Sequence, residues 1–273
     1  MPSFYDTHAH LHYPDYADDL PAALERAQAA GITKIIAVGI DLASSKLAVE
    51  LAGRFSGLYA AVGVHPTHAN EAPEDVRPAL RELARHPKVV AIGETGLDYY
   101  RHPSCQASGF PPDIAAYKRN QARLFEQQLE VAAELGLNVV VHQRESLEDT
   151  LALMAKFTGR VRGQFHCFDN DAAALQRVLA LGSLVSFTGI LTFKNRQSLR
   201  EVLAGTPMGQ FLLETDSPYL VPEPYRGRVK RCEPAFVREI AIVAAKVKGC
   251  SLDELSEATC RAAAGFFAKL GTA

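Results

Sequence analysis

The stretch FYDTHAHL, residues 4–11, begins as an apolar strand and ends in two histidines separated by one residue. In an extended strand, side chains two positions apart point to the same side. His8 and His10 therefore project together, and Asp6 shares their side if the strand includes it. Two neutral imidazoles on one side can bind a divalent cation, or they can be ordinary polar residues at a strand end. The rest of the chain has to decide between these interpretations.

Apolar runs like the first one recur along the chain, and many are rich in β-branched residues. Amphipathic stretches of helical period separate them, such as residues 18–31 and 117–136, and Gly136 is placed to end the second helix. Including the first, the eight runs are SFYDTHAHL, TKIIAVGI, LYAAVGVHP, VVAIGETGLD, LNVVVHQR, GQFHCF, LVSFTGIL and FLLETDSP. Near-continuous apolar strands that alternate with helices predict a parallel sheet covered by helices.

The spacing of these runs predicts how the sheet closes. Strand ends recur about every 30 residues, which is the size of one βα unit. Eight such units predict an α/β fold with a single (β/α)₈ TIM-type barrel over residues 1–273, rather than an open doubly wound sheet. The G-x-G-x-x-G fingerprint is absent after the first strand, which weakens the open-sheet alternative. Two later helical stretches, 234–248 and 252–270, are expected to pack on the barrel.

Composition narrows the class of protein. The 273 residues are 48% hydrophobic and 22% charged, and the net charge of −2 argues against a protein that coats nucleic acid through bulk charge. The five cysteines form no C-x-x-C pair and their odd number does not suggest a disulfide framework, so a reduced, cytoplasmic setting is expected. We find neither a secretory signal nor an apolar run long enough to span a bilayer.

Histidines and acids fall in phase with the predicted strands. In (β/α)₈ barrels the active site lies at the carboxyl ends of the strands. The residues in question are His8 and His10 after the first strand, His65 after the third, Glu94 after the fourth, His142 after the fifth, His166 after the sixth and Asp216 after the eighth. Without His65, this set supplies nitrogen and oxygen ligands for two divalent cations, with Glu94 as a natural bridge. Such ligands suit Zn²⁺, Mn²⁺ or Fe²⁺, whereas Mg²⁺ normally prefers more oxygen.

Each of these residues also has an ordinary structural interpretation. His65 precedes a proline and can hold a loop, so we expect it to contact substrate rather than a metal. His142 and His166 can be hydrogen-bonded core histidines, and Glu94 and Asp216 can be capping acids. These alternatives explain single positions but not their shared phase. We expect the remaining histidines at the surface and Cys167 in the core; those histidines are His12, His68, His86 and His102.

The motifs DTHAHL, AVGVHP, AIGETGLDYY, VHQR, FHCF, SFTGILTFKN and LLETDSPYL resemble, in order, those of the TatD family of metal-dependent hydrolases. The resemblance covers nearly the whole chain and implies an amidohydrolase-like (β/α)₈ barrel. It also implies metal-dependent deoxyribonuclease activity that trims DNA from the 3′ end. By motif, the ligands of one metal would be His8, His10, Glu94 and Asp216, and those of the other would be Glu94, His142 and His166.

Three positions depart from the family pattern. The segment at residues 101–121 is longer than the corresponding loop, and we expect residues 101–112 to form a surface loop whose shortening leaves folding intact. Gln143 stands where the family usually has serine, and Cys232 replaces the asparagine of an RNEP motif. The last two departures affect outer or phosphate contacts rather than the metal ligands.

Hydrolysis of a phosphodiester is the chemistry that the resemblance implies for this ligand set. Two cations about 3.5–4 Å apart can activate water and neutralise charge on the leaving oxygen. We expect Asp216 and Glu94 to be the catalytic carboxylates, with Asp216 orienting and deprotonating the water. Glu214 shares the strand side of Asp216 and is either an acid behind the ligands or half of a buried ion pair.

Binding a nucleic-acid substrate needs positively charged side chains and aromatic rings at the mouth of the barrel. The expected phosphate contacts are Arg144, Lys194, Arg226, Arg228, Lys230 and Arg231, although a solvated charge run is the usual alternative for the last four. Tyr99, Tyr100 and Tyr225 are expected to stack on a terminal base. The expected partner is the 3′ end of DNA or RNA, with no membrane and no obligate protein partner.

Other functions remain open from the sequence. The same metal-activated water could hydrolyse an ester, such as a D-aminoacyl-tRNA, or a cyclic amide. The basic run favours a nucleotide substrate over these. A metal-binding or scaffolding protein without catalysis is disfavoured by the complete ligand set, and a turnover assay separates it from an enzyme.

Overall fold

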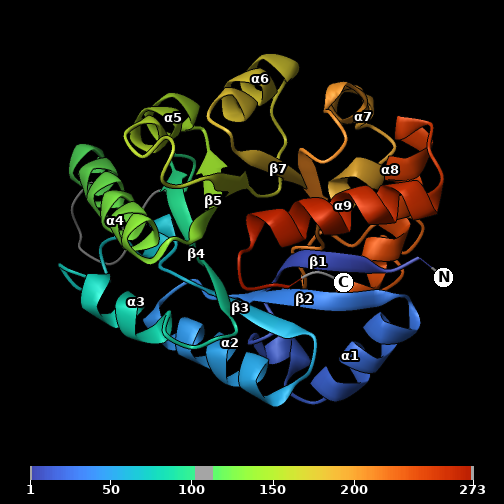
Figure 1. The fold of residues 1–273 in the computed structure, drawn as a ribbon, viewed down its shortest axis with the longest axis horizontal. Helices are drawn as coiled ribbons and strands as arrows, with labels where there is room; N and C mark the ends of the chain where they lie inside the picture. The colour runs from blue at the N-terminus through green and yellow to red at the C-terminus, as the bar shows by residue number, and fades with distance from the viewer. Residues whose placement is uncertain (1, 102–112, 272–273) are drawn as a thin grey trace.

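A computed structural model describes residues 2–101 and 113–271 of the chain (Figure 1). The surface loop expected at residues 101–112 lies, apart from Arg101, outside the described residues, and so do His102 and Cys105. The strands are β1 (Phe4–Ala9), β2 (Ile32–Val38), β3 (Leu58–Val62), β4 (Val89–Asp98), β5 (Asn138–Arg144), β6 (Gly163–Phe165), β7 (Leu184–Phe187) and β8 (Phe211–Leu213). The α-helices are α1 (Leu20–Ala29), α2 (Leu42–Arg54), α3 (Arg77–Leu83), α4 (Ile114–Leu135), α5 (Leu147–Ala155), α6 (Ala172–Ala180), α7 (Gln197–Gly205), α8 (Val237–Lys248) and α9 (Leu252–Phe266).

The eight strands form one parallel sheet in chain order, from β1 to β8. The sheet meets itself where the backbone N–H of His10 donates to the Ser217 carbonyl at 2.7 Å and that of Asp216 donates to the His8 carbonyl at 2.9 Å. Helices follow the strands around the outside (Figure 1). The predicted (β/α)₈ barrel is therefore confirmed.

Local sequence signals account for several element ends. The Asp113 side chain accepts a hydrogen bond from the Ala116 N–H and begins α4, and Gly136 ends the helix with a φ of 65°. No atom lies near the position of a Cβ at Gly136, so glycine is favoured there by its left-handed backbone alone. The predicted stop of this helix is confirmed.

Two expected boundaries differ from the structure. The helix expected at 234–248 is divided into the 3₁₀-helix η5 (Pro234–Phe236) and α8, and the helix expected at 252–270 ends at Phe266. Beyond α9 the chain turns, because Phe267 and Leu270 both insert their side chains into the apolar interior. The three other 3₁₀-helices with described bounds are η1 (Pro14–Tyr16), η2 (Pro66–His68) and η4 (Gly189–Thr192).

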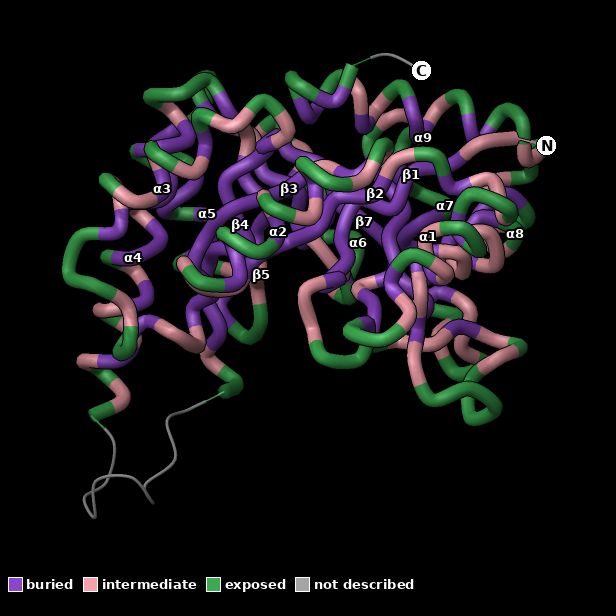
Figure 2. The backbone as a smooth tube through the Cα atoms, turned by 90° about the horizontal axis from the view of Figure 1, so that it is seen from below, coloured by how far each residue is buried: buried purple, intermediate pink, exposed green. Residues whose placement is uncertain are grey.

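The core has two parts. One lies between the strands and the surrounding helices. The other lies at the amino-terminal end of the barrel, where Phe266 of α9 and the following residue Phe267 pack against strand residues such as Tyr5 and Val90. In Figure 1, α9 crosses the front of the barrel, and Figure 2 shows it on the same side as both termini. The opposite, carboxyl-terminal end of the barrel is left to the candidate site. Among the described residues, no helix combines the length and apolarity needed to cross a membrane.

Candidate metal centre

Six strands deliver the predicted histidines and acids to one end of the barrel. His8 lies in β1, Glu94 in β4 and His142 in β5. His10, His65, His166 and Asp216 follow the ends of β1, β3, β6 and β8. Glu94 lies inside β4 rather than after it, because pairing with β5 continues as far as Asp98 and Arg144. All seven side chains converge on one cluster.

Glu94 is the centre of this cluster. Its Oε1 lies 2.9 Å from His166 Nε2 and 3.0 Å from His142 Nδ1. Its Oε2 lies 3.4 Å from His8 Nε2 and 3.6 Å from His10 Nε2. The two oxygens of one buried carboxylate therefore face two different sets of imidazoles, as a bridging ligand requires.

Asp216 completes the set that contains His8 and His10. Its Oδ1 lies 3.6 Å from His8 Nε2 and 3.4 Å from His10 Nε2, and these two nitrogens are 3.3 Å apart. Asp216 has a φ of 56°, in the left-handed region that few residues other than glycine, asparagine and aspartate adopt readily. In three groups of side chains, the possible ligand atoms lie within 4.8 Å of one another. The groups are His8, Glu94 and His166; His8, His10 and Asp216; and His65, Glu94 and His142.

The outer hydrogen bonds of two histidines leave a ring nitrogen free to bind a cation. His10 Nδ1 lies 3.0 Å from the Val38 carbonyl, which can only accept, so Nδ1 carries the hydrogen and Nε2 presents a lone pair to the cluster. His142 Nε2 lies 3.0 Å from Asp98 Oδ2, which leaves Nδ1 toward Glu94. A carboxylate or carbonyl behind the ring is the usual support of a metal-binding histidine.

His65 differs from these histidines. The backbone N–H of Thr67 donates to His65 Nδ1 at 3.2 Å, so in the neutral ring the hydrogen is on Nε2, which lies 3.4 Å from Glu94 Oε1. His65 thus offers a hydrogen-bond donor to the cluster where His10 and His142 offer lone pairs. The structure brings His65 into the cluster, and this tautomer favours its predicted role as a contact rather than a metal ligand.

The charges in the cluster favour a cation at its centre. Burial opposes ionisation of Glu94, but the surrounding imidazoles, His166 first, outweigh burial and hold its pKa well below the usual value. Burial likewise lowers the pKa of His166, yet the charge of Glu94 and the nearby carboxylate of Glu214 raise it well above its ordinary value. Buried ionised carboxylates need positive partners, which protons or divalent cations can supply. The donor set therefore fits divalent metal ions.

Asp98 is a site residue that the sequence analysis missed. It is buried at the end of β4, and its hydrogen bond to His142 lowers its pKa despite burial. Gly96 has a φ of 130° and lies opposite His142, where a Cβ would come within 2.0 Å of the His142 carbonyl oxygen. Glu94, Gly96 and Asp98 alternate along one strand, so the same two-residue spacing that singled out His8 and His10 could have identified Asp98.

Glu214 lies behind His166. Its Oε1 accepts the backbone N–H of Cys167 at 2.7 Å and lies 3.6 Å from His166 Nδ1, and its Oε2 accepts the Gln164 amide at 2.7 Å. Of the two alternatives left open for Glu214, the structure favours an acid behind the ligands. Cys167 is half-buried beside Thr188 rather than in the core, because its φ of 47° turns the chain at the end of β6.

Asp6 and His12 are two further residues with buried polar atoms near the cluster. Asp6 is fully buried, and burial raises its pKa to about 8 although Thr215 donates two hydrogen bonds to it. His12 was expected at the surface, but both of its ring nitrogens are buried, and its ring packs edge-on against His10 and Tyr13. Burial lowers the pKa of His12 to about 4, so it is neutral at neutral pH.

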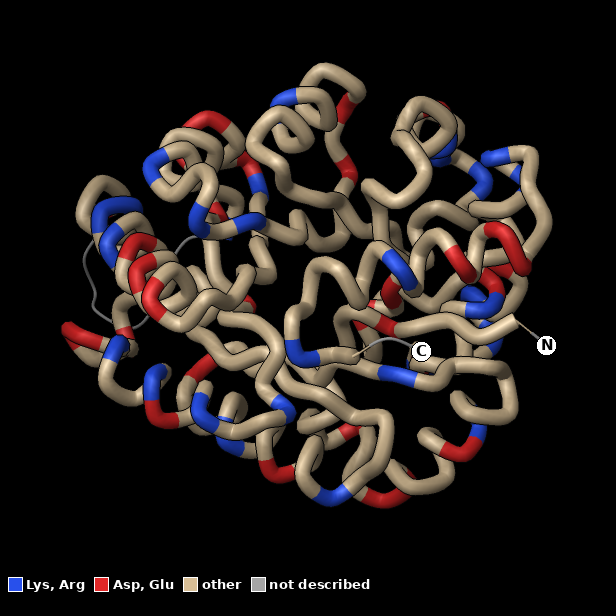
Figure 3. Tube along the Cα trace, viewed as in Figure 1, with Lys and Arg blue, Asp and Glu red and all other residues tan. Residues whose placement is uncertain are grey.

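The predicted phosphate-binding cations fall into two groups. Arg144, Lys194, Arg226, Arg228 and Lys230 are exposed. Arg231 is instead held by ion pairs to Asp19 and Glu233, with the closest nitrogen–oxygen distance to Asp19 being 2.7 Å. Arg231 therefore departs from the expected phosphate contact, because two nearby carboxylates already neutralise it. Figure 3 shows positive and negative residues interspersed along the outer helices.

The tyrosines expected to stack on a base are occupied by other side chains. Lys118 Nζ lies 3.9 Å from the centre of the Tyr99 ring, and the Tyr99 hydroxyl donates to Asp149. The guanidinium carbon of Arg144 lies 3.7 Å from the Tyr100 ring centre. The Tyr225 ring stacks on Phe236 at 4.8 Å and 14°. The structure thus assigns each of these rings an intramolecular partner.

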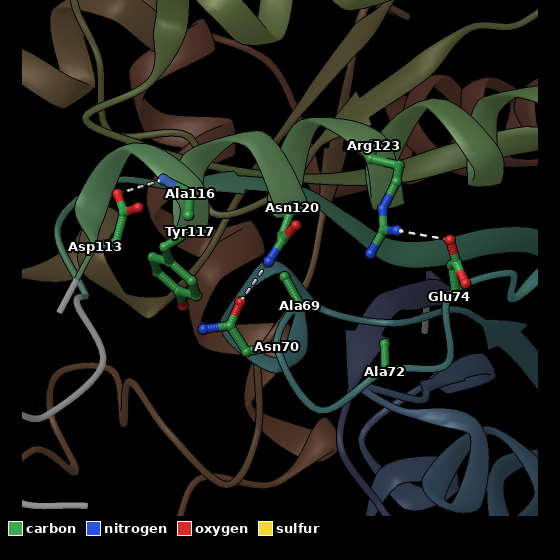
Figure 4. Close-up of a pocket in the computed structure, with 9 residues that line it drawn as sticks. All are labelled: Ala69, Asn70, Ala72, Glu74, Asp113, Ala116, Tyr117, Asn120 and Arg123. Carbon is green, nitrogen blue, oxygen red and sulfur yellow. Dashed lines mark hydrogen bonds and ion pairs between the residues drawn. The ribbon is translucent and has the colours of Figure 1, made fainter. Parts of the chain in front are cut away.

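A separate pocket of about 490 Å³ lies between the segment after β3 and the first turns of α4 (Figure 4). The Asn120 amide donates to Asn70 Oδ1 across it at 2.9 Å, and Arg123 faces Glu74 at 3.9 Å. None of the candidate metal ligands lines this pocket. It is therefore distinct from the cluster around Glu94.

Comparison with known proteins agrees with this geometry. A family model described as TatD related DNase matches residues 5–268. The uncharacterized metal-dependent hydrolase YabD of Bacillus subtilis (strain 168) is 36% identical over 93% of this chain and 95% of its own length. The 3′-5′ ssDNA/RNA exonuclease TatD of Erwinia amylovora is 34% identical over 96% of this chain and 99% of its own length.

Solved structures give the same result. YjjV, a TatD homolog from Escherichia coli K12, superposes with a TM-score of 0.85 at 27% identity, covering 97% of this chain and 98% of its own. The organophosphorus hydrolase of Deinococcus radiodurans, at 17% identity and a TM-score of 0.62 over 98% of this chain and 93% of its own, shares the fold. The match over nearly the whole length, together with the cluster of histidines and acids, places the chain in the TatD family of metal-dependent hydrolases.

Proposed function

We propose that this hydrolase cleaves phosphodiester bonds and removes nucleotides from the 3′ end of single-stranded DNA or RNA. The observation that carries the proposal is the position of Glu94, whose two oxygens face separate sets of histidines within 3.6 Å. A carboxylate shared by two ligand sets is the arrangement that two-metal phosphodiester hydrolysis uses. The Erwinia amylovora relative, named a 3′-5′ ssDNA/RNA exonuclease, supports the same direction and class of substrate.

The residues present fit a pair of divalent cations. His8, His10, Glu94 and Asp216 would hold one, and Glu94, His142 and His166 would hold the other. When bound, such cations supply Lewis acidity: they make water a stronger acid and neutralise charge that builds on the phosphate.

Asp216 is the proposed proton acceptor. Burial opposes its ionisation, but the adjacent imidazoles of His10 and His8 lower its pKa, so it is ionised at neutral pH. Its side chain is 15% exposed while that of Glu94 is 4% exposed, so Asp216 is the more accessible of the two acids. An ionised carboxylate at this edge can orient a water molecule and accept its proton. Glu94 would then serve the reaction mainly by holding the two cations.

The positive side chains at the mouth are proposed to hold the phosphates of the strand. Arg226, Arg228 and Lys230 lie in the segment that connects β8 to η5, downstream of Asp216, and are exposed. The Arg226 guanidinium carbon lies 3.9 Å from the centre of the Phe193 ring. This stacking contact holds the guanidinium in place for binding a phosphate. Few such contacts are needed by an enzyme that grips a strand end, which agrees with the net charge of −2.

Metal-stripped protein should be tested with Zn²⁺, Mn²⁺ and Mg²⁺ separately, on single-stranded oligonucleotides labelled at the 3′ or the 5′ end. We expect one or more cations to restore activity, with early release of the 3′ label as mononucleotide while the 5′-labelled strand shortens in single steps. Early release of a 5′ mononucleotide would reverse the direction. Efficient hydrolysis of an aminoacyl ester or a cyclic amide, with no cleavage of either oligonucleotide, would move the substrate to the alternative class.

The contribution of the positively charged side chains is tested by varying the salt concentration. On single strands the logarithm of affinity falls with the logarithm of salt concentration by about 0.7 per phosphate contact. Arg228→Ala and Lys230→Ala should raise KM for oligonucleotides, flatten this dependence and leave metal content unchanged. Arg231→Ala serves as the comparison, since its ion pair with Asp19 should make its main effect one on stability.

A further inference from the structure

Two tyrosines that neither the metal centre nor the predicted stacking residues include lie beside the candidate ligands. The backbone N–H of Tyr13 donates to the His10 carbonyl at 3.3 Å, and that of Tyr219 donates to the Asp216 carbonyl at 3.0 Å. Each tyrosine is therefore tied, three residues along the chain, to a candidate ligand of the same cation. A side chain attached in this way moves little relative to the reacting phosphate.

The two rings form a corner against His10. The Tyr13 ring stacks on the His10 ring, with centres 5.1 Å apart and planes 12° apart. The Tyr219 ring stands across both of them: its centre lies 6.0 Å from Tyr13 at 80° and 6.4 Å from His10 at 68°. One ring is parallel to the imidazole of a candidate ligand, and the other forms a wall beside it.

Tyr219 presents its ring to solvent. It is 53% exposed, among the most exposed of the large hydrophobic side chains in the described residues. Its contacts with aromatic rings in the described part of the chain are the edge contacts with His10 and Tyr13, whereas Tyr99, Tyr100 and Tyr225 each have a cation or a stacked ring on a face. An exposed aromatic ring at the edge of the candidate site offers a face on which a base can stack.

The backbone on both sides is restrained. Tyr13 is extended, with φ −72° and ψ 151°, and is followed by Pro14, which disfavours the helical conformation at the preceding residue. Tyr219 follows Pro218, whose ring fixes its own φ. Tyrosine itself loses little side-chain freedom on binding because it has only two side-chain torsions. The corner is therefore prepared for a ligand at low entropic cost.

We propose that Tyr219, supported by Tyr13, is the platform on which the base next to the scissile phosphate stacks. The proposal rests on the function proposed above and adds the recognition element of the substrate: a nucleobase, of any identity, within one nucleotide of the cleaved bond. Stacking on an aromatic ring tolerates all four bases, because each has a π-face. The site should then require a base at this position without selecting which one.

The first test uses the lack of tryptophan in the chain. Tyr219→Trp creates a single tryptophan on the platform, and its fluorescence can be followed as the full-length protein is titrated with a dinucleotide that has a non-hydrolysable phosphonate linkage. We expect saturable quenching, with Mn²⁺ present and at higher concentration in its absence. The same linkage with an abasic sugar in place of the nucleoside should give no quenching.

A matched control lies at the other end of the barrel. Tyr59, near the start of β3, is partly exposed and has Lys88 Nζ 4.4 Å from its ring centre. Tyr59→Trp should not respond to the dinucleotide. Equal quenching in both variants, or equal quenching by the abasic compound, would overturn the platform.

The second test is kinetic. Tyr219→Ala should raise KM for single-stranded DNA roughly tenfold, the usual size of a lost base–aromatic stack. It should keep its metal content and the salt dependence of wild type, and Tyr219→Phe should restore the wild-type KM. A substrate that is abasic next to the scissile bond should be cleaved equally by wild type and Tyr219→Ala.

The two proposals fail in different ways. If wild type cleaves neither the normal nor the abasic strand, the nuclease function is wrong. If wild type cleaves both strands with the same KM and Tyr219→Ala is silent, the nuclease function stands and the platform is overturned.

Discussion

The two ends of the barrel are made by the same strands but are closed by opposite chemistry. At the amino-terminal end, Phe266 of α9 fills the opening with apolar side chains together with Phe267 and Leu270, which follow the helix. At the carboxyl-terminal end, the buried Glu94 and the half-buried Asp216 lie among imidazoles at distances of 2.9–3.6 Å. Burying apolar groups stabilises the fold, whereas burying charges is costly unless they are paired. Stability and chemistry are therefore located at different ends, and substitutions should separate them.

The largest effect is expected for Glu94→Gln, which keeps the shape of the side chain and removes the charge shared by both ligand sets. Loss of the proposed pair of cations should remove several kcal/mol of transition-state stabilisation, or at least ~10³-fold in kcat/KM. We expect metal content, measured by mass spectrometry, to fall with activity. Glu130→Gln, at an exposed ion pair with Arg77, is the control. Full metal content and activity in Glu94→Gln would remove Glu94 from the centre of the site.

Substitutions at the amino-terminal end of the barrel should change stability rather than activity. Phe266→Ala opens a cavity under α9, and we expect it to lower the free energy of unfolding by about 3–5 kcal/mol. Leu47→Ala, at a residue 47% exposed on α2, should change it by less than about 0.5 kcal/mol. Urea denaturation measures both. The kcat of the folded Phe266→Ala protein should equal that of wild type, and a lower kcat would show that the two ends are coupled.

A smaller effect is expected where one hydrogen bond orients a ligand. Asp98→Asn weakens the contact that holds His142 with Nδ1 toward Glu94. Loss of such an outer partner typically costs about 10–100-fold in metal affinity or activity. Titration with metal should show the weaker binding, and excess metal should restore most of the activity. If saturating metal restores nothing, Asp98 acts on the reaction itself rather than by positioning His142.

The smallest effect concerns pH. Burial, and then the nearby His142, lower the pKa of His65 to about 4 from an ordinary value of 6.5. Between these values the unfolded chain binds the proton and the folded chain does not, so this group withdraws stability as pH falls from 6.5 to 4. With a chelator present, His65→Asn should lose less stability than wild type over this range in urea denaturation.

His68→Asn is the matched control for that measurement. His68 lies nearer the surface, where it contacts Glu71 at 2.8 Å. Its substitution should leave the change between pH 6.5 and 4 close to that of wild type. A His65→Asn protein that follows the wild-type curve would show that His65 is not buried in its neutral form.

Much of the barrel and of the ligand set follows from local sequence pattern. The eight apolar runs, the stop at Gly136 and the two-residue spacing of His8 and His10 are all properties of short segments, because strand and helix periods are set by backbone geometry. The phase of the histidines then follows from the barrel, since parallel strands bring their carboxyl ends together. Asp98 could have been added by the same spacing within β4.

Other features depended on contacts between distant segments. Arg231 forms an ion pair with Asp19, which is far from it in the sequence, and is therefore not available to bind phosphate. The hydrogen bond from Thr67 fixes which nitrogen of His65 faces Glu94, and the meeting of Tyr13 with Tyr219 depends on closure between β1 and β8. The sequence by itself determined the repeat, the barrel and the types of ligand. Only the tertiary structure decided which charges were already paired and which rings stayed exposed, because pairing and exposure depend on how the closed barrel brings its loops together.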